Sequence, residues 1–157
     1  MKIRGAPAIA SLAALSISSY LSRASNRTPQ PEFLSSLDAL QENLSPILDH
    51  LYTSRPTAVN LGAAITRLRT VMSAGLQKNA SVGEVVRGLI LEGRAIADED
   101  VGRNKAMARL GAEWILRTAE EKHSDISHGV NILTVCNTGS LATSVGLKLL
   151  LASVPND

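Results

Sequence analysis

Apolar residues recur every three to four positions along most of this chain, and that periodicity limits the fold more than any other feature. The apolar stripes lie within residues 9–21, 33–51, 61–72, 85–96 and 107–115. Each stripe predicts an amphipathic α-helix. Aromatic residues make up 3% of the chain although 45% of it is hydrophobic, so we expect a core of closely packed helices with small side chains.

Boundary residues divide these stripes into separate helices. Pro46 interrupts the second stripe and predicts either a kink or the start of a new helix there. Thr57 is placed to cap the third helix, and the apolar pattern of this helix weakens near Gly75. Ser81 and Glu84 have the spacing of a capping box and open the fourth. A separate last helix is expected to end near His123 and Ser124.

The N-terminal segment has two interpretations. Lys2 and Arg4 before an apolar run give the outline of a signal peptide, whereas Pro7 suits the first turn of a helix. A polar serine face favours the helix, because a signal peptide has no need of one. The expected apolar stripe is Ile9, Leu12, Ala13, Ile17, Tyr20 and Leu21, with Ser11, Ser18, Ser19 and Ser22 mainly outside it.

The pattern changes after residue 124. Residues 130–135 are β-branched and apolar and predict a buried strand, and residues 141–151 predict a helix. A strand, a small polar turn and a helix form the opening unit of an α/β fold. We therefore expect a mostly α chain, with a helical N-terminal domain in 1–124 followed by the beginning of a truncated α/β domain in 125–157.

Composition excludes several classes of protein. The net charge is +2, which argues against a basic nucleic-acid-binding arm, and no apolar run reaches the ~18 residues of a membrane span. One cysteine, Cys136, excludes an internal disulfide and a cysteine-based zinc cluster. The three histidines lack metal-ligand spacing, so no metal site is expected. The acidic residues at 98–100 are expected to form a solvated turn with local ion pairs.

Two arginines precede predicted helix starts. Arg4 is followed by Gly5 at the first helix, and Arg55 is followed by Pro56 before the third. Helix N-termini carry free N–H groups and a partial positive charge, so an added guanidinium makes a plausible phosphate site. The alternative is an ordinary helix start with a surface arginine, and spacing alone favours it for either arginine taken singly.

Cys136 follows the predicted strand, at the edge where open α/β sheets bind ligands. The polar residues Asn137, Thr138 and Gly139 come next and lead into a helix. A helix N-terminus near the thiol lowers its pKa and favours the thiolate. The alternative is a buried structural cysteine, and the polar neighbours favour the functional interpretation.

Three segments together carry a resemblance to a known family. Residues 3–9, 54–60 and 132–143 resemble, in order, motifs of the methylthioribose-1-phosphate isomerases, and 100–112 also fits. The resemblance implies an aldose–ketose isomerase of methionine salvage that acts on 5-methylthioribose 1-phosphate. It implies that the helical domain in 1–124 is incomplete at its start and that 125–157 begin a Rossmann-like α/β domain. It further implies a homodimer without metal or organic cofactor, with no nucleic-acid or membrane partner, located in the cytoplasm and also the nucleus.

The resemblance also implies residue roles. Arg4, Gly5, Ala6 and Arg55 match substrate- and phosphate-binding positions, and Cys136 matches the cysteine that acts in the isomerisation. Asn137, Thr138 and Gly139 match supporting positions around this cysteine.

This chain departs from the family pattern in three respects. Val135 stands where histidine is frequent, and Ser140 where alanine is usual. The family's proton-donor aspartate has no match here, so we expect the chain to be an incomplete part of the enzyme that is inactive by itself. Two alternatives stay open, a regulatory subunit-like binding protein of the translation initiation exchange-factor family and a ribose 1,5-bisphosphate isomerase.

Overall fold

The computed structural model describes residue 3 and residues 5–122, and this part of the chain is helical. Its elements are α1 (Ala6–Ser25), the 3₁₀-helix η1 (Glu32–Leu34), α2 (Leu37–Thr53), α3 (Val59–Gln77) and α4 (Val82–Glu121). The expectation of a mostly helical N-terminal part is confirmed. The domain boundary after residue 124, the strand at 130–135 and the helix at 141–151 lie outside the described residues.

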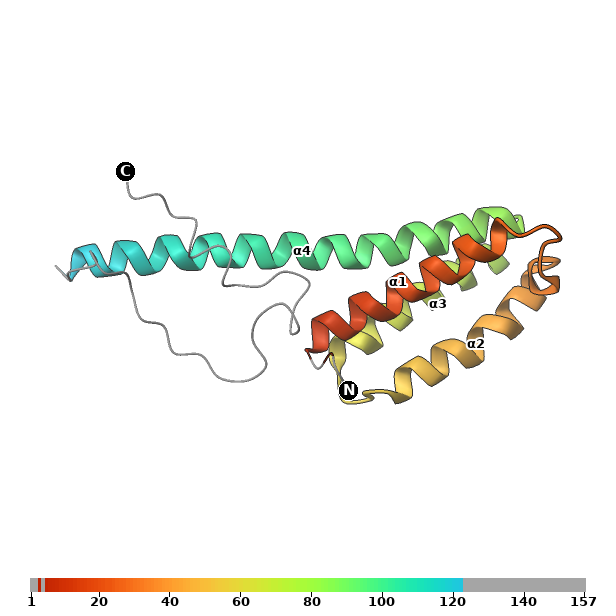
Figure 1. Cartoon of the computed structure of the whole chain (residues 1–157), viewed down its shortest axis with the longest axis horizontal. Coiled ribbons are helices and arrows are strands. Elements are labelled where there is room, and N and C mark those ends of the chain that lie inside the picture. Colours follow the sequence, from red (N-terminus) through yellow and green to blue (C-terminus); the bar gives the residue numbers. More distant parts are fainter. Residues whose placement is uncertain (1–2, 4, 123–157) are drawn as a thin grey trace.

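The helices form a bundle along one half of α4. Helices α1 and α3 pack against each other and against α4, and α2 packs against α3 and η1 on the outer side (Figure 1). The second half of α4 continues past the bundle. Within residues 5–122, no helix combines the length and the apolarity needed to cross a membrane.

Leucines fill the centre of the bundle. The largest fully buried side chains are Leu21, Leu40, Leu44, Leu61, Leu68 and Leu89. The rings of Tyr20 and Phe33 stack at its edge, with centroids 5.5 Å apart, and Trp114 is 59% exposed. The expected core of closely packed helices with few aromatic rings is therefore confirmed.

Helices α1 and α4 approach each other through small residues. A Cβ atom on Gly93 would overlap Ser18 Oγ and lie 2.6 Å from the Ala14 carbonyl oxygen. Ser18 Oγ lies 3.1 Å from the carbonyl oxygens of both Ala14 and Ile90, and donates to them. Helix α1 is thus an amphipathic helix of the core, as predicted.

The orientation of α1 differs from the predicted stripe. Ser11 and Ser18, expected outside the stripe, are buried, whereas Leu12, expected within it, is 50% exposed. The close approach of α4 is the reason, because the contact face admits only small side chains and turns the larger leucine outward.

Helix α2 continues through Pro46, so of the two predicted alternatives no new helix starts there. The predicted cap of α3 is wrong. The N-cap of α3 is Ala58, not Thr57. The turn before α3 explains this shift: the Ala58 N–H donates to the Arg55 carbonyl at 2.9 Å, and the Ala58 carbonyl accepts the bond from Gly62 at 3.2 Å.

The capping box at the start of α4 is confirmed, since the Ser81 side chain accepts from the Glu84 N–H and the Glu84 carboxylate accepts from the Ser81 N–H.

The expected break before a last helix is wrong, because α4 is one helix of 40 residues. Residues 98–100 lie inside it rather than in a turn. No proline interrupts this stretch, and Glu99 pairs with Arg103 one turn later along the helix.

Candidate functional site

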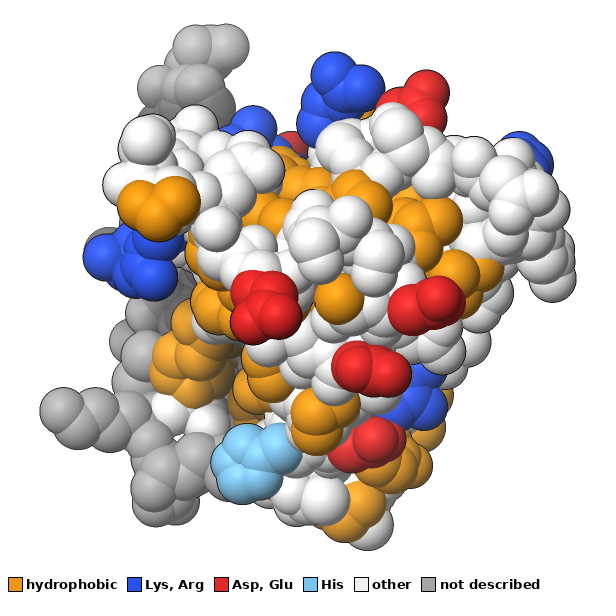
Figure 2. Space-filling model, turned by 90° about the vertical axis from the view of Figure 1, so that its right-hand side faces the viewer, with side chains coloured by type: hydrophobic (Ala, Val, Ile, Leu, Met, Phe, Trp, Pro, Cys, Tyr) orange, Lys and Arg blue, Asp and Glu red, His pale blue; other side chains and the backbone are white. Residues whose placement is uncertain are grey.

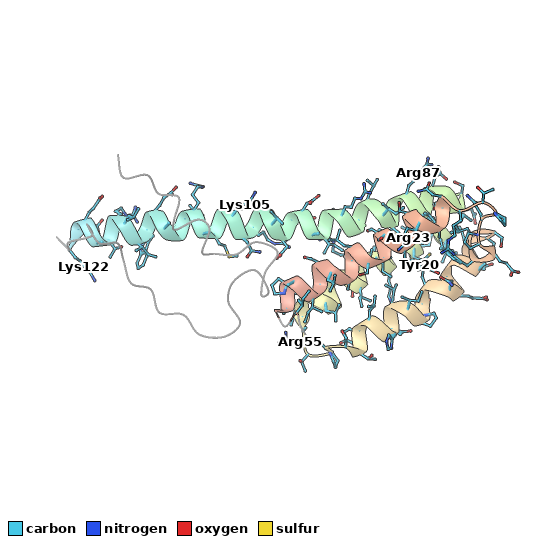
Figure 3. All side chains as sticks on the ribbon, viewed as in Figure 1. Tyr20, Arg23, Arg55, Arg87, Lys105 and Lys122 are labelled. Carbon is cyan, nitrogen blue, oxygen red and sulfur yellow. The ribbon has the colours of Figure 1, made fainter. Side chains whose placement is uncertain are left out.

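The N-termini of α1 and α3 lie together at one end of the bundle. Pro7 and Asn60, each in the first turn of its helix, line the same cavity of about 260 Å³. The middle of α4 closes this cavity through Ile96, Asp100 and Arg103. Figure 3 places Arg55 at the same end of the bundle.

Gly5 is the N-cap of α1 and is buried. Its backbone is extended, with φ −67° and ψ 131°, and its carbonyl accepts a hydrogen bond from the Ile9 N–H at 3.0 Å. Ala6 begins the helix and packs against the core. Both predicted binding residues therefore sit at the N-terminus of α1, where the first backbone N–H groups have no acceptor within the helix itself. Arg4 lies outside the described residues.

Arg55 lies in the ordered turn between α2 and α3. Its N–H donates to the Tyr52 carbonyl at 3.4 Å, and the Tyr52 hydroxyl donates to the Pro56 carbonyl at 3.3 Å. This turn holds Arg55 four residues before α3 begins. The predicted position of an arginine beside a helix start is thus confirmed, and its role toward a phosphate stays a prediction.

The two helix N-termini at the opposite end of the bundle are already neutralised by their own side chains. Ser36 caps α2 and Ser81 caps α4, and Asp38 and Glu84 lie in the first turns of these helices. Acidic side chains are spread over this end of the molecule (Figure 2). Hydrogen bonds from the Ser81 hydroxyl and N–H hold the pKa of Glu84 below its ordinary value, so its carboxylate stays charged.

At the candidate site the N-termini of α1 and α3 have neither kind of compensation. Their caps are Gly5 and Ala58, which carry no side-chain acceptor, and the first turns contain no acidic residue. Neither N-terminus is therefore compensated by a side chain of its own cap or first turn, and the positive ends of both helix dipoles lie at this end of the bundle. An anion such as a phosphate fits this end of the bundle.

A cluster of charges beside the cavity joins α3 to α4. Arg67 donates two bonds of 2.8 Å to the Glu99 carboxylate and one of 2.5 Å to Glu92. The hydrogen bonds to Glu99 and Glu92 raise the pKa of Arg67, and the bond from Arg67 lowers the pKa of Glu99. With Arg103, which also pairs with Glu99, the cluster holds two arginines and two glutamates, so it fastens the two helices rather than attracting an anion.

Sequence reasoning missed the role of Arg67 in this cluster. The spacing of Glu99 and Arg103 is a sequence signal for pairing along a helix. The partnership of Arg67 with Glu99 depends on how α3 packs on α4, which no local spacing reveals.

Two polar residues of α4 are buried near the cavity. Asp100 is 8% exposed and Asn104 is 9% exposed, and the Asn104 amide donates to the Asp100 carbonyl at 2.8 Å. In the described part of the chain, no three His, Cys, Asp or Glu side chains are grouped so that they could hold a metal ion.

The structure thus brings together Gly5, Ala6 and Arg55 at one end of the bundle. The remaining predicted site residues, Cys136, Asn137, Thr138 and Gly139, lie outside the described residues.

Comparison with known proteins places this arrangement in a family. Residues 2–154 match the model of the initiation factor 2 subunit family. The chain belongs to this family. Within it, the chain is 56% identical over 144 residues to a methylthioribose-1-phosphate isomerase of Laccaria bicolor, and 53% identical to one of Postia placenta.

These matches cover 92% of the chain but only 38% and 37% of the two relatives. A solved structure, the 5-methylthioribose 1-phosphate isomerase of Pyrococcus horikoshii, superposes with a TM-score of 0.65 at 27% identity. That superposition covers 92% of this chain and 35% of the other. The resemblance carried by residues 3–9, 54–60 and 132–143 is confirmed by these relatives.

Proposed function

We propose that this chain supplies the phosphate-binding end and the reactive thiol of an aldose–ketose isomerase. The reaction converts 5-methylthioribose 1-phosphate to 5-methylthioribulose 1-phosphate in methionine salvage. The observation that carries the proposal is the meeting of two helix N-termini, α1 and α3, which lack both acidic residues and side-chain caps. The names of the relatives support the choice of substrate.

The phosphate is bound first in this proposal. Arg4 and Arg55 donate charge-assisted hydrogen bonds, and the N–H groups at the start of α1 complete the cradle. Gly5 carries no side chain, so the substrate can approach the backbone closely. These groups hold the sugar without taking part in bond breaking.

The isomerisation then moves hydrogen between two carbons. The anomeric oxygen carries the phosphate, so the ring cannot open to a free aldehyde, and an acid must protonate the ring oxygen. Hydrogen leaves C2 and reaches C1 as a proton through an enediolate-like species or as a hydride. Cys136 stands beside C2 in this scheme, and Asn137, Thr138 and Gly139 support it. No metal or organic cofactor takes part in the proposed route.

The proposed assembly follows the resemblance in its remaining details. Residues 125–157 contribute the first strand–turn–helix unit of a Rossmann-like domain, and the complete enzyme is a homodimer of the cytoplasm and nucleus. The β-branched run at 130–135 supports the strand.

A chimera tests the proposed activity. The 144 matched residues of the Laccaria bicolor isomerase are replaced by those of this chain, and formation of 5-methylthioribulose 1-phosphate is followed by phosphorus NMR. We expect turnover, because the replaced part supplies the same groups at the same places. A folded chimera without turnover would contradict the proposal.

Two variants of the chimera separate binding from chemistry. Cys136→Ala should abolish turnover while phosphate binding persists, and Arg55→Ala should raise KM at least tenfold because a charge-assisted bond is lost. Unchanged turnover in Cys136→Ala would remove this thiol from the mechanism. Preference for ribose 1,5-bisphosphate would favour the alternative isomerase. Loss of all turnover with binding to exchange-factor subunits would favour the regulatory role.

A further inference from the structure

Asp100 shares a cavity with the N-termini of α1 and α3. It is 8% exposed and lines the same cavity as Pro7 of α1 and Asn60 of α3. Gly93 lies seven residues before Asp100 on α4 and packs against Ala14, which lies seven residues after Pro7 on α1. Because α1 and α4 run in opposite directions (Figure 1), Asp100 is level with the first turn of α1. Helix α4 thus supplies the acidic residue that the first turns of α1 and α3 lack.

The other charged side chains of the cavity wall are balanced by their ion-pair partners. Arg67 and Arg103 line the cavity. Arg67 pairs with Glu92 and Glu99, and Arg103 pairs with Glu99, so two guanidinium groups meet two carboxylates. Asp100 is a third carboxylate. Among the described residues of the wall and their ion-pair partners, one negative charge is therefore in excess.

A carboxylate at this position limits how much negative charge the site accepts. Each helix N-terminus carries roughly half a positive charge, and Arg55 lies at the same end of the bundle (Figure 3). A phosphate group carries about −1.5 to −2 charges at pH 7. One phosphate therefore uses up the positive charge that Asp100 leaves, and a second phosphate on the same ligand is repelled. Hydroxyl groups are not repelled, because a carboxylate accepts hydrogen bonds from them.

The small size of the cavity strengthens this discrimination. Its volume of about 260 Å³ is below the ~300–1,000 Å³ of most ligand pockets. A sphere of this volume is about 8 Å wide, which is about the Debye length of ~8 Å in physiological salt. Salt therefore screens the repulsion between Asp100 and a ligand in the cavity only in part.

We propose that Asp100 is a specificity residue that restricts this site to sugars with a single phosphate group. The proposal rests on the proposed function for the identity of the ligand as a sugar phosphate. Asp100 favours 5-methylthioribose 1-phosphate, whose other end is uncharged, over ribose 1,5-bisphosphate. Because the discrimination comes from charge, its effect on binding grows with the charge of the ligand.

Isothermal titration calorimetry of this chain with two ligands, ribose 1-phosphate and ribose 1,5-bisphosphate, tests the proposal at constant ionic strength. Asp100→Asn removes the charge and keeps nearly the same shape. We expect this substitution to lower the Kd of ribose 1-phosphate about threefold and that of ribose 1,5-bisphosphate about tenfold. The second factor is larger because the repulsion that is removed acts on twice the ligand charge.

Two further variants are matched to this change. Asp98→Asn removes the same charge two residues earlier on α4, where the side chain is exposed, and should leave both Kd values unchanged. Asp100→Glu keeps the charge and should keep the ratio of the two Kd values. Far-UV circular dichroism and thermal unfolding check that all three variants keep the fold.

Three results would overturn the proposal. The first is an Asp100→Asn chain in which both Kd values fall by the same factor or do not fall. The second is an Asp98→Asn or Asp100→Glu chain that shifts the ratio of the Kd values as Asp100→Asn does. The third is a lack of binding of both sugar phosphates to this chain.

These readouts do not need turnover, so they are separate from the test of the proposed function. An active chimera whose preference between the two sugar phosphates is unchanged by Asp100→Asn would remove the role of Asp100 and leave the isomerase intact. The predicted shift in the ratio of Kd values, together with an inactive chimera, would support the role of Asp100 and contradict the proposed function.

Discussion

At the scale of single residues, Gly93 fixes how closely α1 and α4 approach. A side chain there would meet the backbone of Ala14, which cannot rotate away as a flexible side chain can. The burial of Ser18 and the outward turn of Leu12 both follow from this contact. The absence of a side chain at Gly93 thus determines which face of α1 packs into the core.

Gly93→Ala should lower the free energy of unfolding by about 1–3 kcal/mol, because overpacking outweighs the ~1 kcal/mol that alanine gains as a helix former. Gly102 provides the control, since a Cβ there meets nothing within 4 Å. Gly102→Ala should raise the free energy of unfolding by about 0.5–1 kcal/mol. Urea unfolding followed by circular dichroism measures both. Stabilisation by both substitutions would mean that α1 and α4 are not in close contact.

At the scale of elements, ion pairs between α3 and α4 make the stability depend on pH. The hydrogen bonds from Arg67 lower the pKa of Glu99 in the folded state. A lowered carboxyl pKa contributes stability above the unfolded pKa, near 4.3. That contribution to the stability disappears as the pH falls through the pKa that Glu99 has in the folded state.

Glu99→Gln should therefore destabilise the chain at pH 7, and the difference from the unsubstituted chain should shrink toward zero below pH 4. Thermal unfolding of both proteins across this range measures the difference. Glu120→Gln on the same helix is the control, because Glu120 is exposed and lies 21 residues further along α4, far from Arg67. A difference that stays constant from pH 7 to pH 3 would show that the charge of Glu99 contributes nothing.

The elements themselves were largely predictable from local signals. Helical periodicity located α1, α2 and α3, and the Ser81–Glu84 box located the start of α4. The continuity of α4 was not predictable, because a cluster of charges at 98–105 is equally compatible with a turn and with a helix surface. Pro46 left two alternatives open, and the structure excludes a new helix there, because α2 continues on its far side, where Leu48 is buried in the core.

At the scale of the whole molecule, the candidate site depends on two helices that begin at the same end. The sequence indicates an arginine before each helix, but only the packing of α1 beside α3 places both N-termini at one cavity. That arrangement follows from α2, which runs back to the end of the bundle where α1 begins. Helix α3 therefore starts at that end and runs parallel to α1 (Figure 1). Residues 130–143 carry the other half of the predicted site.

Inorganic phosphate should raise the melting temperature of the chain, because a ligand that binds only the folded state stabilises it by about 2.7 kcal/mol at a hundredfold excess over Kd. Arg55→Ala should weaken this stabilisation. Arg87→Ala, at the opposite end of the bundle, should leave it unchanged (Figure 3). Sodium chloride at equal ionic strength controls for screening. An equal rise in all three proteins would place the anion elsewhere.

The unbroken helix α4 has a consequence for how the length of this chain can vary. One residue inserted between Asp100 and Met107 would rotate the projecting half by about 100° relative to the bundle and turn the side of α4 that carries Trp114 by the same angle. Seven inserted residues would turn it by only about 20° while lengthening the helix by ~10 Å. Natural insertions and deletions in this stretch should therefore come in multiples close to seven, and isolated ones should be eliminated by selection.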